Sequence, residues 1–181
     1  MYRVRRRVLR RAVRRTGTRV EGAAVLDVGS GTGFYVRQWV DLGAASVLGL
    51  DLSETAVASL RRALPAAEFL RADVADPPME LAAGQFDLVS AFDVLFHIVD
   101  DERFHRSIGN LARLTKPGGH LLFSDNFVHG PARRSRNQVS RPLTEIEGAV
   151  LDAGLEIVER TPMFVLMNAP LDARGPLLRQ A

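Results

Sequence analysis

A glycine-rich turn directly after an apolar run is the sequence feature that most constrains how this chain folds. Residues 24–28 read Ala-Val-Leu-Asp-Val, which is typical of a buried strand, and Gly29-Ser30-Gly31-Thr32-Gly33 follows at once. Glycines allow a tight turn and let a ligand approach the backbone, because no Cβ lies in between. A helix expected at about 33–42 would present its free N–H groups at the same place. The sequence therefore predicts a ligand site where the first strand ends.

The spacing of the glycines separates the nucleotide-binding classes that use such a turn. The dinucleotide fingerprint G-x-G-x-x-G would need glycine at position 34, where this chain has Phe34, and this disfavours a nicotinamide-dependent oxidoreductase. No Gly-Lys-Ser/Thr follows, which excludes a P-loop. Asp51 ends the second apolar run, 51 − 31 = 20 residues after Gly31, and can accept two hydrogen bonds from a ribose diol. The alternative is a turn that only packs a helix on a strand, with Asp51 as a helix cap.

Apolar, strand-like runs alternate with amphipathic helical stretches through most of the chain. The expected strands are residues 24–28, 46–51, 68–71, 86–92 and 120–124, with a sixth in the β-rich stretch 155–167. The other expected elements are helices at about 53–64 and 101–114, a polar, arginine-bearing loop at about 127–141, and a helix from Thr144 as N-cap to Ala153. This order predicts a mostly parallel sheet with helices on both faces. A ligand crevice is expected where the first and fourth strands end, because the winding reverses there.

Five segments, in chain order, resemble motifs of the class I S-adenosylmethionine-dependent methyltransferases. They are residues 25–33, 48–53, 71–74, 86–91 and 114–121. Over about residues 20–127 the chain is therefore identified as a member of that family. The resemblance implies a Rossmann-like three-layer α/β/α sandwich, S-adenosylmethionine as cofactor, and methyl transfer to an acceptor at oxygen, nitrogen or carbon.

The resemblance also implies which residues meet the amino-acid end of the cofactor. Asp27 and the backbone of Gly29 and Gly31 would meet the methionine part, and Ala91 and Phe92 would lie near it. The rest of the turn would complete the cofactor cradle, with Ser30 and Gly33 among the binding residues.

The nucleoside end is implied in the same way. Asp51 would hold the ribose hydroxyls, and Leu52 would pack on the adenine. Asp73 would accept a hydrogen bond from the adenine amino group, and Val74 would line the adenine pocket. An ordinary loop carboxylate is the alternative for Asp73.

The methyl transfer itself makes few demands on side chains. The sulfonium of the cofactor already makes its methyl group electrophilic, so the protein has to place the acceptor in line and exclude water. A general base is needed only if the acceptor is protonated at the working pH. His97 is the catalytic candidate, as a base or as a hydrogen-bonding partner of the acceptor. The alternative is a histidine that ties the loop after the fourth strand to a backbone carbonyl.

The acceptor is expected to be a small molecule. Amino-group methylation of DNA or of protein glutamine goes with an Asn-Pro-Pro-Tyr-like tetrad after the fourth strand, and Ser90-Ala91-Phe92-Asp93 stands there instead. No spacing typical of metal ligands occurs, so no metal is expected. The arginines of the loop 127–141 could grip an anionic substrate; a solvated loop is the other interpretation. These arginines are Arg133, Arg134, Arg136 and Arg141.

Charge is concentrated at the start of the chain. Residues 1–19 hold nine arginines and no acidic residue, so the remaining residues sum to 3 − 9 = −6. Val4, Val8 and Ala12 fall four apart, as one stripe of a helix would. We expect this helix to pack through that stripe and expose its arginines to water; contact with RNA, DNA or an anionic membrane is the alternative.

These patterns divide the chain into an arginine-rich arm at 1–19, a cofactor-binding domain at 20–168 and a tail at 169–181. The family sheet ordinarily has a seventh strand, and no run after Met167 resembles one. The alternative function is therefore a cofactor-binding but inactive or truncated methyltransferase-like domain. The chain has no cysteine and no apolar run long enough for a bilayer, so a cytoplasmic location without a membrane span is expected. The sequence leaves the oligomeric state open.

Overall fold

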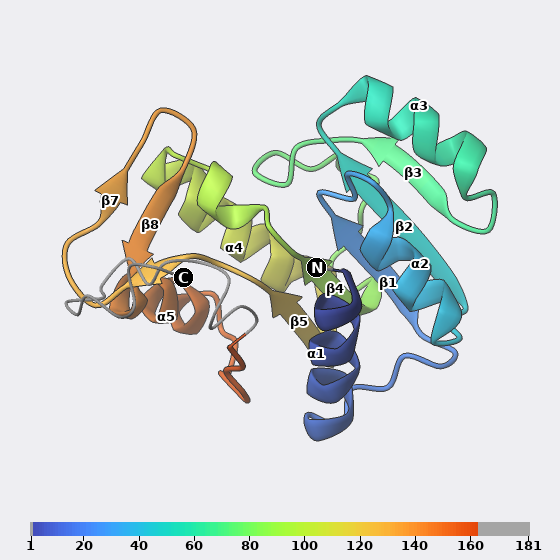
Figure 1. The fold of residues 1–181 in the computed structure, drawn as a ribbon, viewed down its shortest axis with the longest axis horizontal. Coiled ribbons are helices and arrows are strands. Elements are labelled where there is room, and N and C mark those ends of the chain that lie inside the picture. The colour runs from blue at the N-terminus through green and yellow to red at the C-terminus, as the bar shows by residue number, and fades with distance from the viewer. Residues whose placement is uncertain (1, 163–181) are drawn as a thin grey trace.

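The computed structural model describes residues 2–162 and is built around one open parallel sheet (Figure 1). Its strands are β1 (Ala24–Val28), β2 (Ser46–Asp51), β3 (Glu68–Arg71), β4 (Phe86–Ala91) and β5 (Thr115–Phe123). They lie in the order β3-β2-β1-β4-β5, and each neighbouring pair is parallel. The winding reverses between β1 and β4, as the sequence predicts.

Helices cover both faces of this sheet. They are α1 (Tyr2–Arg15), α2 (Phe34–Asp41), α3 (Glu54–Ala63), α4 (Asp101–Leu114) and α5 (Leu143–Asp152), with a short 3₁₀ helix, η1 (Leu95–His97), after β4. Buried residues of α1, α2 and α3 share one hydrophobic cluster, and those of α4 and α5 share the other. The expected three-layer α/β/α sandwich is confirmed.

Neighbouring residues of one strand belong alternately to the two hydrophobic clusters. Val25 and Leu88 belong to the cluster under α1, α2 and α3, whereas Leu26 and Val89 belong to the one under α4 and α5. Side chains of a strand alternate between its faces, so a strand covered on both sides must be apolar throughout. This is why the runs at 24–28 and 86–91 are almost continuously hydrophobic.

Helix starts follow local capping chemistry in two cases and depart from it in a third. Ser53 accepts a hydrogen bond from the Ala56 N–H at 3.2 Å, and Asp100 accepts one from the Arg103 N–H at 2.8 Å. The expected N-cap at Thr144 is wrong. The N-cap is Pro142, two residues earlier, and α5 begins at Leu143, because the strand before it ends at Pro142 and the chain passes directly into the helix.

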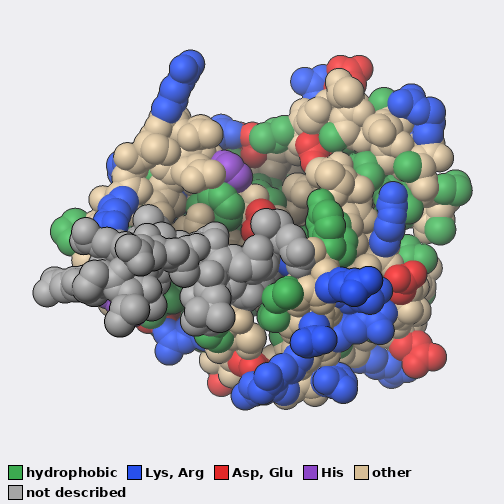
Figure 2. All heavy atoms as spheres, in the orientation of Figure 1, with side chains coloured by type: hydrophobic (Ala, Val, Ile, Leu, Met, Phe, Trp, Pro, Cys, Tyr) green, Lys and Arg blue, Asp and Glu red, His purple; other side chains and the backbone are tan. Residues whose placement is uncertain are grey.

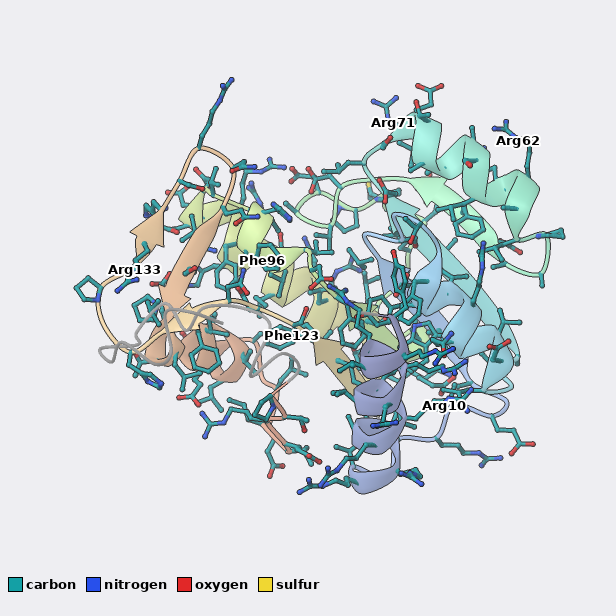
Figure 3. All side chains as sticks on the ribbon, viewed as in Figure 1. Arg10, Arg62, Arg71, Phe96, Phe123 and Arg133 are labelled. Atoms are coloured by element: carbon teal, nitrogen blue, oxygen red, sulfur yellow. The ribbon has the colours of Figure 1, made fainter. Side chains whose placement is uncertain are left out.

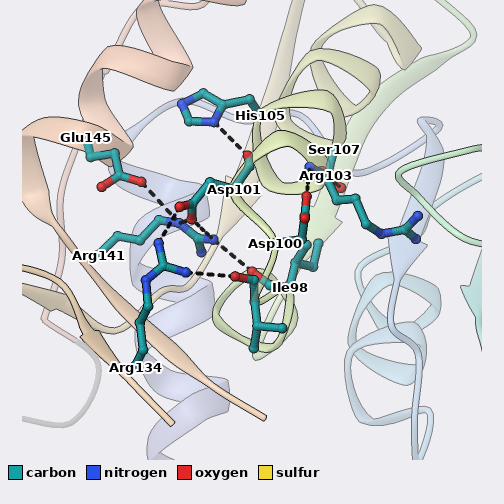
Figure 4. A network of polar contacts seen from close by, with 10 residues as sticks. Ile98, Asp100, Asp101, Arg103, His105, Ser107, Arg134, Arg141 and Glu145 are labelled. Carbon is teal, nitrogen blue, oxygen red and sulfur yellow. Dashed lines mark hydrogen bonds and ion pairs between the residues drawn. The ribbon is translucent and has the colours of Figure 1, made fainter. Parts of the chain in front are cut away.

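The segment expected as a polar loop at 127–141 contains a second, three-stranded sheet. Its strands are β6 (Phe127–Val128), β7 (Arg133–Arg134) and β8 (Val139–Pro142), in the order β6-β8-β7. Arg141 of β8 is 0% exposed, so the solvated interpretation is wrong for it. Its guanidinium bonds to Asp101 at 2.8 Å (Figure 4). It also lies 3.9 Å from the centre of the Phe104 ring. These partners are far from it in the sequence, which is why local polarity misled the prediction.

The sixth strand is not formed in its described part. Residues 155–162 have alternating burial, and Leu155 and Ile157 pack against the cluster under α4 and α5, but no strand pairing involves them. The period-2 pattern therefore indicates an extended chain with one inward face, and a strand also requires a hydrogen-bonded neighbour. The rest of that stretch and the expected tail at 169–181 lie outside the described residues.

Between residues 2 and 162, no helix combines the length and apolar character that crossing a bilayer requires.

Replacing Arg141 with alanine should lower the free energy of unfolding by about 3 kcal/mol, because it removes a fully buried side chain together with its ion pairs and its packing on the Phe104 ring. Arg141 also contacts Glu145 at 3.2 Å and the Ile98 carbonyl at 2.9 Å. Arg134→Ala is the matched control, since Arg134 binds the same Asp101 but is 46% exposed, and should cost under about 1 kcal/mol. Urea unfolding of both variants measures the difference, and equal losses would contradict this account.

Candidate functional site

A cavity of about 320 Å³ lies where β1 and β4 end. It is lined by Tyr2, Arg5, Gly29, Ser30, Gly31, Thr32, Phe34, Tyr35, Phe92 and Asp93. The glycine turn forms one wall and the end of β4 forms another. This is the crevice that the reversal of winding predicts, and it contains four of the expected binding residues: Gly29, Ser30, Gly31 and Phe92.

Gly29 is required by geometry. Its φ is +70°, in the left-handed region, and a Cβ built on it would lie 2.2 Å from Cγ2 of Val94. Gly33, with φ of +74°, is the N-cap of α2, and a Cβ there would lie 2.7 Å from side-chain atoms of Leu60 and Leu64. A side chain at Gly29 would have to push Val94 aside, and one at Gly33 would have to push the ends of Leu60 and Leu64 aside. Both would also hold a strained backbone, so both positions favour glycine.

Asp51 joins the end of β2 to the turn. One carboxylate oxygen accepts a hydrogen bond from the Gly31 N–H at 2.8 Å, and the other accepts one from the Ser53 N–H at 2.8 Å. Ser53, not Asp51, supplies the side-chain cap of α3. Each carboxylate oxygen can accept a further hydrogen bond, so the group is oriented by the backbone and still able to receive hydroxyl donors.

Asp27 lies beneath the turn and is 2% exposed. The Ser90 hydroxyl donates to its carboxylate at 2.6 Å and accepts from the Trp39 indole N–H at 3.0 Å. Burial raises the pKa of Asp27 to about 6, and these hydrogen bonds oppose the rise. Asp27 is not among the residues that line the cavity, so the structure places it as a support below the expected methionine position.

The end of β4 brings an aromatic pair to the cavity. Phe92 stacks on Tyr35, with the ring centroids 4.2 Å apart. Ala91 is fully buried, one residue before Phe92. Asp93 has a φ of +60°, which is uncommon for a residue with a side chain, and its N–H donates to the Ser124 hydroxyl at 2.8 Å. The chain therefore makes a tight bend where the fourth strand meets the cavity.

The first helix contributes two residues that the sequence interpretation did not identify. Arg5 forms an ion pair with Asp93 and donates to the Tyr35 hydroxyl at 3.3 Å. Burial raises the pKa of Tyr35 to about 12. Tyr2 lines the cavity and packs on Phe34, with the ring centroids 4.8 Å apart. A helix over the site could be anticipated, but which of its residues face inward depends on how the helix is rotated on the sheet.

The residues expected at the adenine lie along the next two strand ends, outside the lining of this cavity. Leu52 follows β2 and is 65% exposed. Asp73 follows β3; its carboxylate accepts from the Ala75 N–H at 2.8 Å and pairs with Arg103. Val74 is buried in the hydrophobic core. The expected adenine contacts are therefore arranged beside Asp51, and the Asp73 carboxylate already has two partners.

His97 lies in η1, where its Nδ1 is 3.1 Å from the Asn137 carbonyl oxygen. This contact ties the loop after β4 to the small second sheet, as the loop-fixing interpretation of this histidine predicts. His97 does not line the cavity. A role toward an acceptor stays a prediction. Of the four arginines of the 127–141 segment, Arg134 and Arg141 are engaged with Asp101.

Comparison with known proteins finds similarity to methyltransferases. A family model described as a methyltransferase domain matches residues 25–119. A probable S-adenosylmethionine-dependent methyltransferase of Mycobacterium tuberculosis is 33% identical over 171 residues, which cover 91% of this chain and 57% of the relative. A ubiquinone biosynthesis O-methyltransferase of Ralstonia nicotianae is 37% identical over 113 residues, covering 57% of this chain and 43% of the relative. The chain thus spans about half the length of these curated relatives.

A solved structure shares the fold. It is the Burkholderia thailandensis 1,6-didemethyltoxoflavin-N1-methyltransferase with bound 1,6-didemethyltoxoflavin and S-adenosylhomocysteine, with a TM-score of 0.72 and 20% sequence identity. The similarity covers 88% of this chain and 71% of that one.

Replacing Asp27 with asparagine should stabilise the protein above pH 6 by about 2–3 kcal/mol. The folded state holds its proton up to a pKa of about 6, whereas the ordinary value is 3.8. Wild-type stability therefore falls as the pH rises through this window, while asparagine does not titrate. The difference in unfolding free energy between variant and wild type should grow from pH 4 to pH 6 and then level off.

Urea unfolding across pH 4–8 measures that difference. Groups that titrate in both proteins contribute equally to variant and wild type, and so cancel in the difference. One such group is Asp125, whose pKa is raised by burial to about 7. Asp41→Asn, at an exposed carboxylate, is the control for the loss of one negative charge. A flat difference for Asp27→Asn would show that burial does not hold the proton on Asp27.

Proposed function

Because the chain belongs to the methyltransferase domain family, we propose that it binds S-adenosylmethionine and transfers the methyl group to a small-molecule acceptor. The observation that carries this proposal is the joining of Asp51 to the glycine turn beside the cavity at the β1–β4 switch point. Bound there, the cofactor would supply an electrophilic methyl group on a sulfonium. The protein contributes binding, orientation and exclusion of water.

The residues present fit such a cofactor in their chemistry. Gly29 and Gly31 leave the wall of the cavity without side chains, which suits close approach of an amino-acid tail. The Asp51 carboxylate stands beside that wall, oriented by two backbone N–H groups, and suits two ribose hydroxyls. The exposed Leu52 can cover one face of a purine.

Asp27 and Asp73 have supporting positions in this proposal. Asp27 would fix the turn from below and add negative charge under the cofactor's ammonium group. Asp73 would receive the adenine amino group while Arg103 holds its carboxylate in place. Val74, Ala91 and the turn residues Ser30 and Gly33 would complete the shape of the site.

The acceptor would enter between α1 and the end of β4. Tyr2, Tyr35 and Phe92 give that side of the cavity an aromatic wall, which suits a flat or apolar acceptor. The toxoflavin enzyme is named for a small-molecule acceptor, and the Ralstonia relative is named for O-methylation in ubiquinone biosynthesis. We extend that class, and not a particular compound, to this chain.

Asp51→Asn should weaken binding of S-adenosylhomocysteine by about 10-fold or more, since a charge-assisted hydrogen bond to a ribose hydroxyl contributes about 1.5–3 kcal/mol. Isothermal titration calorimetry measures the dissociation constant. The control is Glu54→Gln, an exposed carboxylate three residues away that pairs with Arg71, and it should bind as wild type does. If the folded wild-type protein takes up neither S-adenosylmethionine nor its demethylated product, the proposed function is wrong.

His97→Ala tests the proposed acceptor-facing role. If Nδ1–H donates to the Asn137 carbonyl, Nε2 is left as the basic nitrogen of a neutral ring. We expect turnover of an accepted substrate to fall at least 100-fold, with S-adenosylhomocysteine affinity unchanged. His105→Ala, on the exposed face of α4, is the control. Wild-type activity in His97→Ala would leave His97 with the loop-fixing role alone.

A further inference from the structure

The first helix has two faces with different surroundings. Leu9 and Val13 are 1% and 8% exposed and belong to the hydrophobic cluster under α2 and α3. Arg5 also points inward, to Asp93 and Tyr35. α1 therefore packs through Leu9 and Val13. The expected packing stripe of Val4, Val8 and Ala12 is wrong, because Val4 is 42% exposed and the other two are only partly buried.

The opposite face carries a straight row of arginines. Arg3, Arg7, Arg10 and Arg14 are spaced i, i+4, i+7 and i+11, which places them within one narrow stripe of an α-helix. The stripe is about 16 Å long at 1.5 Å per residue. All four side chains are exposed. Figure 2 shows basic side chains gathered over the position of α1, and Figure 3 labels Arg10 beside this helix.

This stripe lacks acidic partners within the described part of the chain. None of its four arginines forms an ion pair with a carboxylate of residues 2–162, whereas the neighbouring Arg15 pairs with Glu159 at 3.3 Å. Like charges four apart on a helix repel one another, and cations at a helix N-terminus oppose its dipole. The helix therefore carries an uncompensated electrostatic cost that a bound polyanion would remove.

The residues around the stripe indicate which kind of partner it suits. An interfacial membrane helix inserts an apolar face into the lipid, whereas Leu9 and Val13 of α1 are buried in the protein. A protein interface is usually centred on buried apolar or aromatic anchors, and only Tyr2 and Val4, at one end of the helix, are exposed apolar residues of α1. A nucleic acid backbone needs only a row of cationic forks.

We infer that the stripe Arg3, Arg7, Arg10 and Arg14 is a binding surface for the phosphate backbone of nucleic acid. Recognition is independent of base sequence, because the stripe offers guanidinium groups and no group suited to reading base edges. The inference is independent of methyl transfer, since it rests on the outer face of α1 alone.

Fluorescence anisotropy with a labelled 20-base-pair DNA duplex of arbitrary sequence tests the inference. Four phosphate contacts predict a slope of about −3.6 for log K against log salt, hence about a 100-fold loss of affinity between 50 and 200 mM salt. The variant with all four stripe arginines replaced by glutamine should lose at least that factor at 50 mM salt and show a nearly flat salt dependence.

A second variant matches the change in net charge. It replaces four exposed arginines outside α1 by glutamine: Arg37, Arg62, Arg106 and Arg136. This control should retain at least a third of the wild-type affinity, and circular dichroism should show that both variants are folded. Both are compared with wild type as purified full-length chains.

Three results would overturn the inference. The first is no duplex binding by wild type at 50 mM salt. The second is an equal loss in the stripe variant and the control, which would show a response to net charge only. The third is stripe-dependent binding to phosphatidylglycerol vesicles with no binding to the duplex, which would assign the surface to a membrane.

Discussion

The structure depends on how a buried carboxylate is held where the first and fourth strands end. The Asp27 carboxylate accepts a hydrogen bond from the Ser90 hydroxyl, and that hydroxyl accepts one from the Trp39 indole N–H. One buried chain of hydrogen bonds therefore joins β1, β4 and α2. Burial opposes ionisation of the carboxylate, and the chain of donors partly offsets that cost. The glycine turn rests on this support, and Asp51 fastens its other side to β2. The proposed cofactor site is thus organised by groups that mostly do not line it.

The first helix links the site to the outside of the molecule. Its inward side supplies Tyr2 and Arg5 to the cavity, and its outward side is a row of arginines. The Arg5–Asp93 ion pair fixes the helix to the end of β4. One element therefore closes the proposed methyl-transfer site and presents the proposed anion-binding surface. Elsewhere in the fold, Arg141 of β8 is joined to α4 through Asp101 (Figure 4).

The parts of the fold that follow from local rules were predictable. Strand runs such as 24–28 and 46–51, the cap at Ser53 and the start of α4 at Asp101 depend on periodicity and on hydrogen bonds within a few residues. The small sheet around Arg141, the start of α5 and the unpaired chain at 155–162 depend on partners elsewhere in the fold. The sequence of a polar, arginine-bearing segment is typical of a solvated loop. Its burial becomes predictable only when the carboxylate that pairs with its arginine is known.

The sequence by itself determined the glycine turn, the succession of strands and helices along the chain, and the acidic residue beside the turn. Positive φ at Gly29 and the 20-residue spacing from Gly31 to Asp51 follow from residue types and from short distances along the chain. Only the tertiary structure decided that Arg5 meets Asp93, 88 residues away, and that Asp27 lies beneath the cavity. The rotation of α1 and the depth of a side chain are set by how whole layers pack, and packing brings together residues that no local pattern connects.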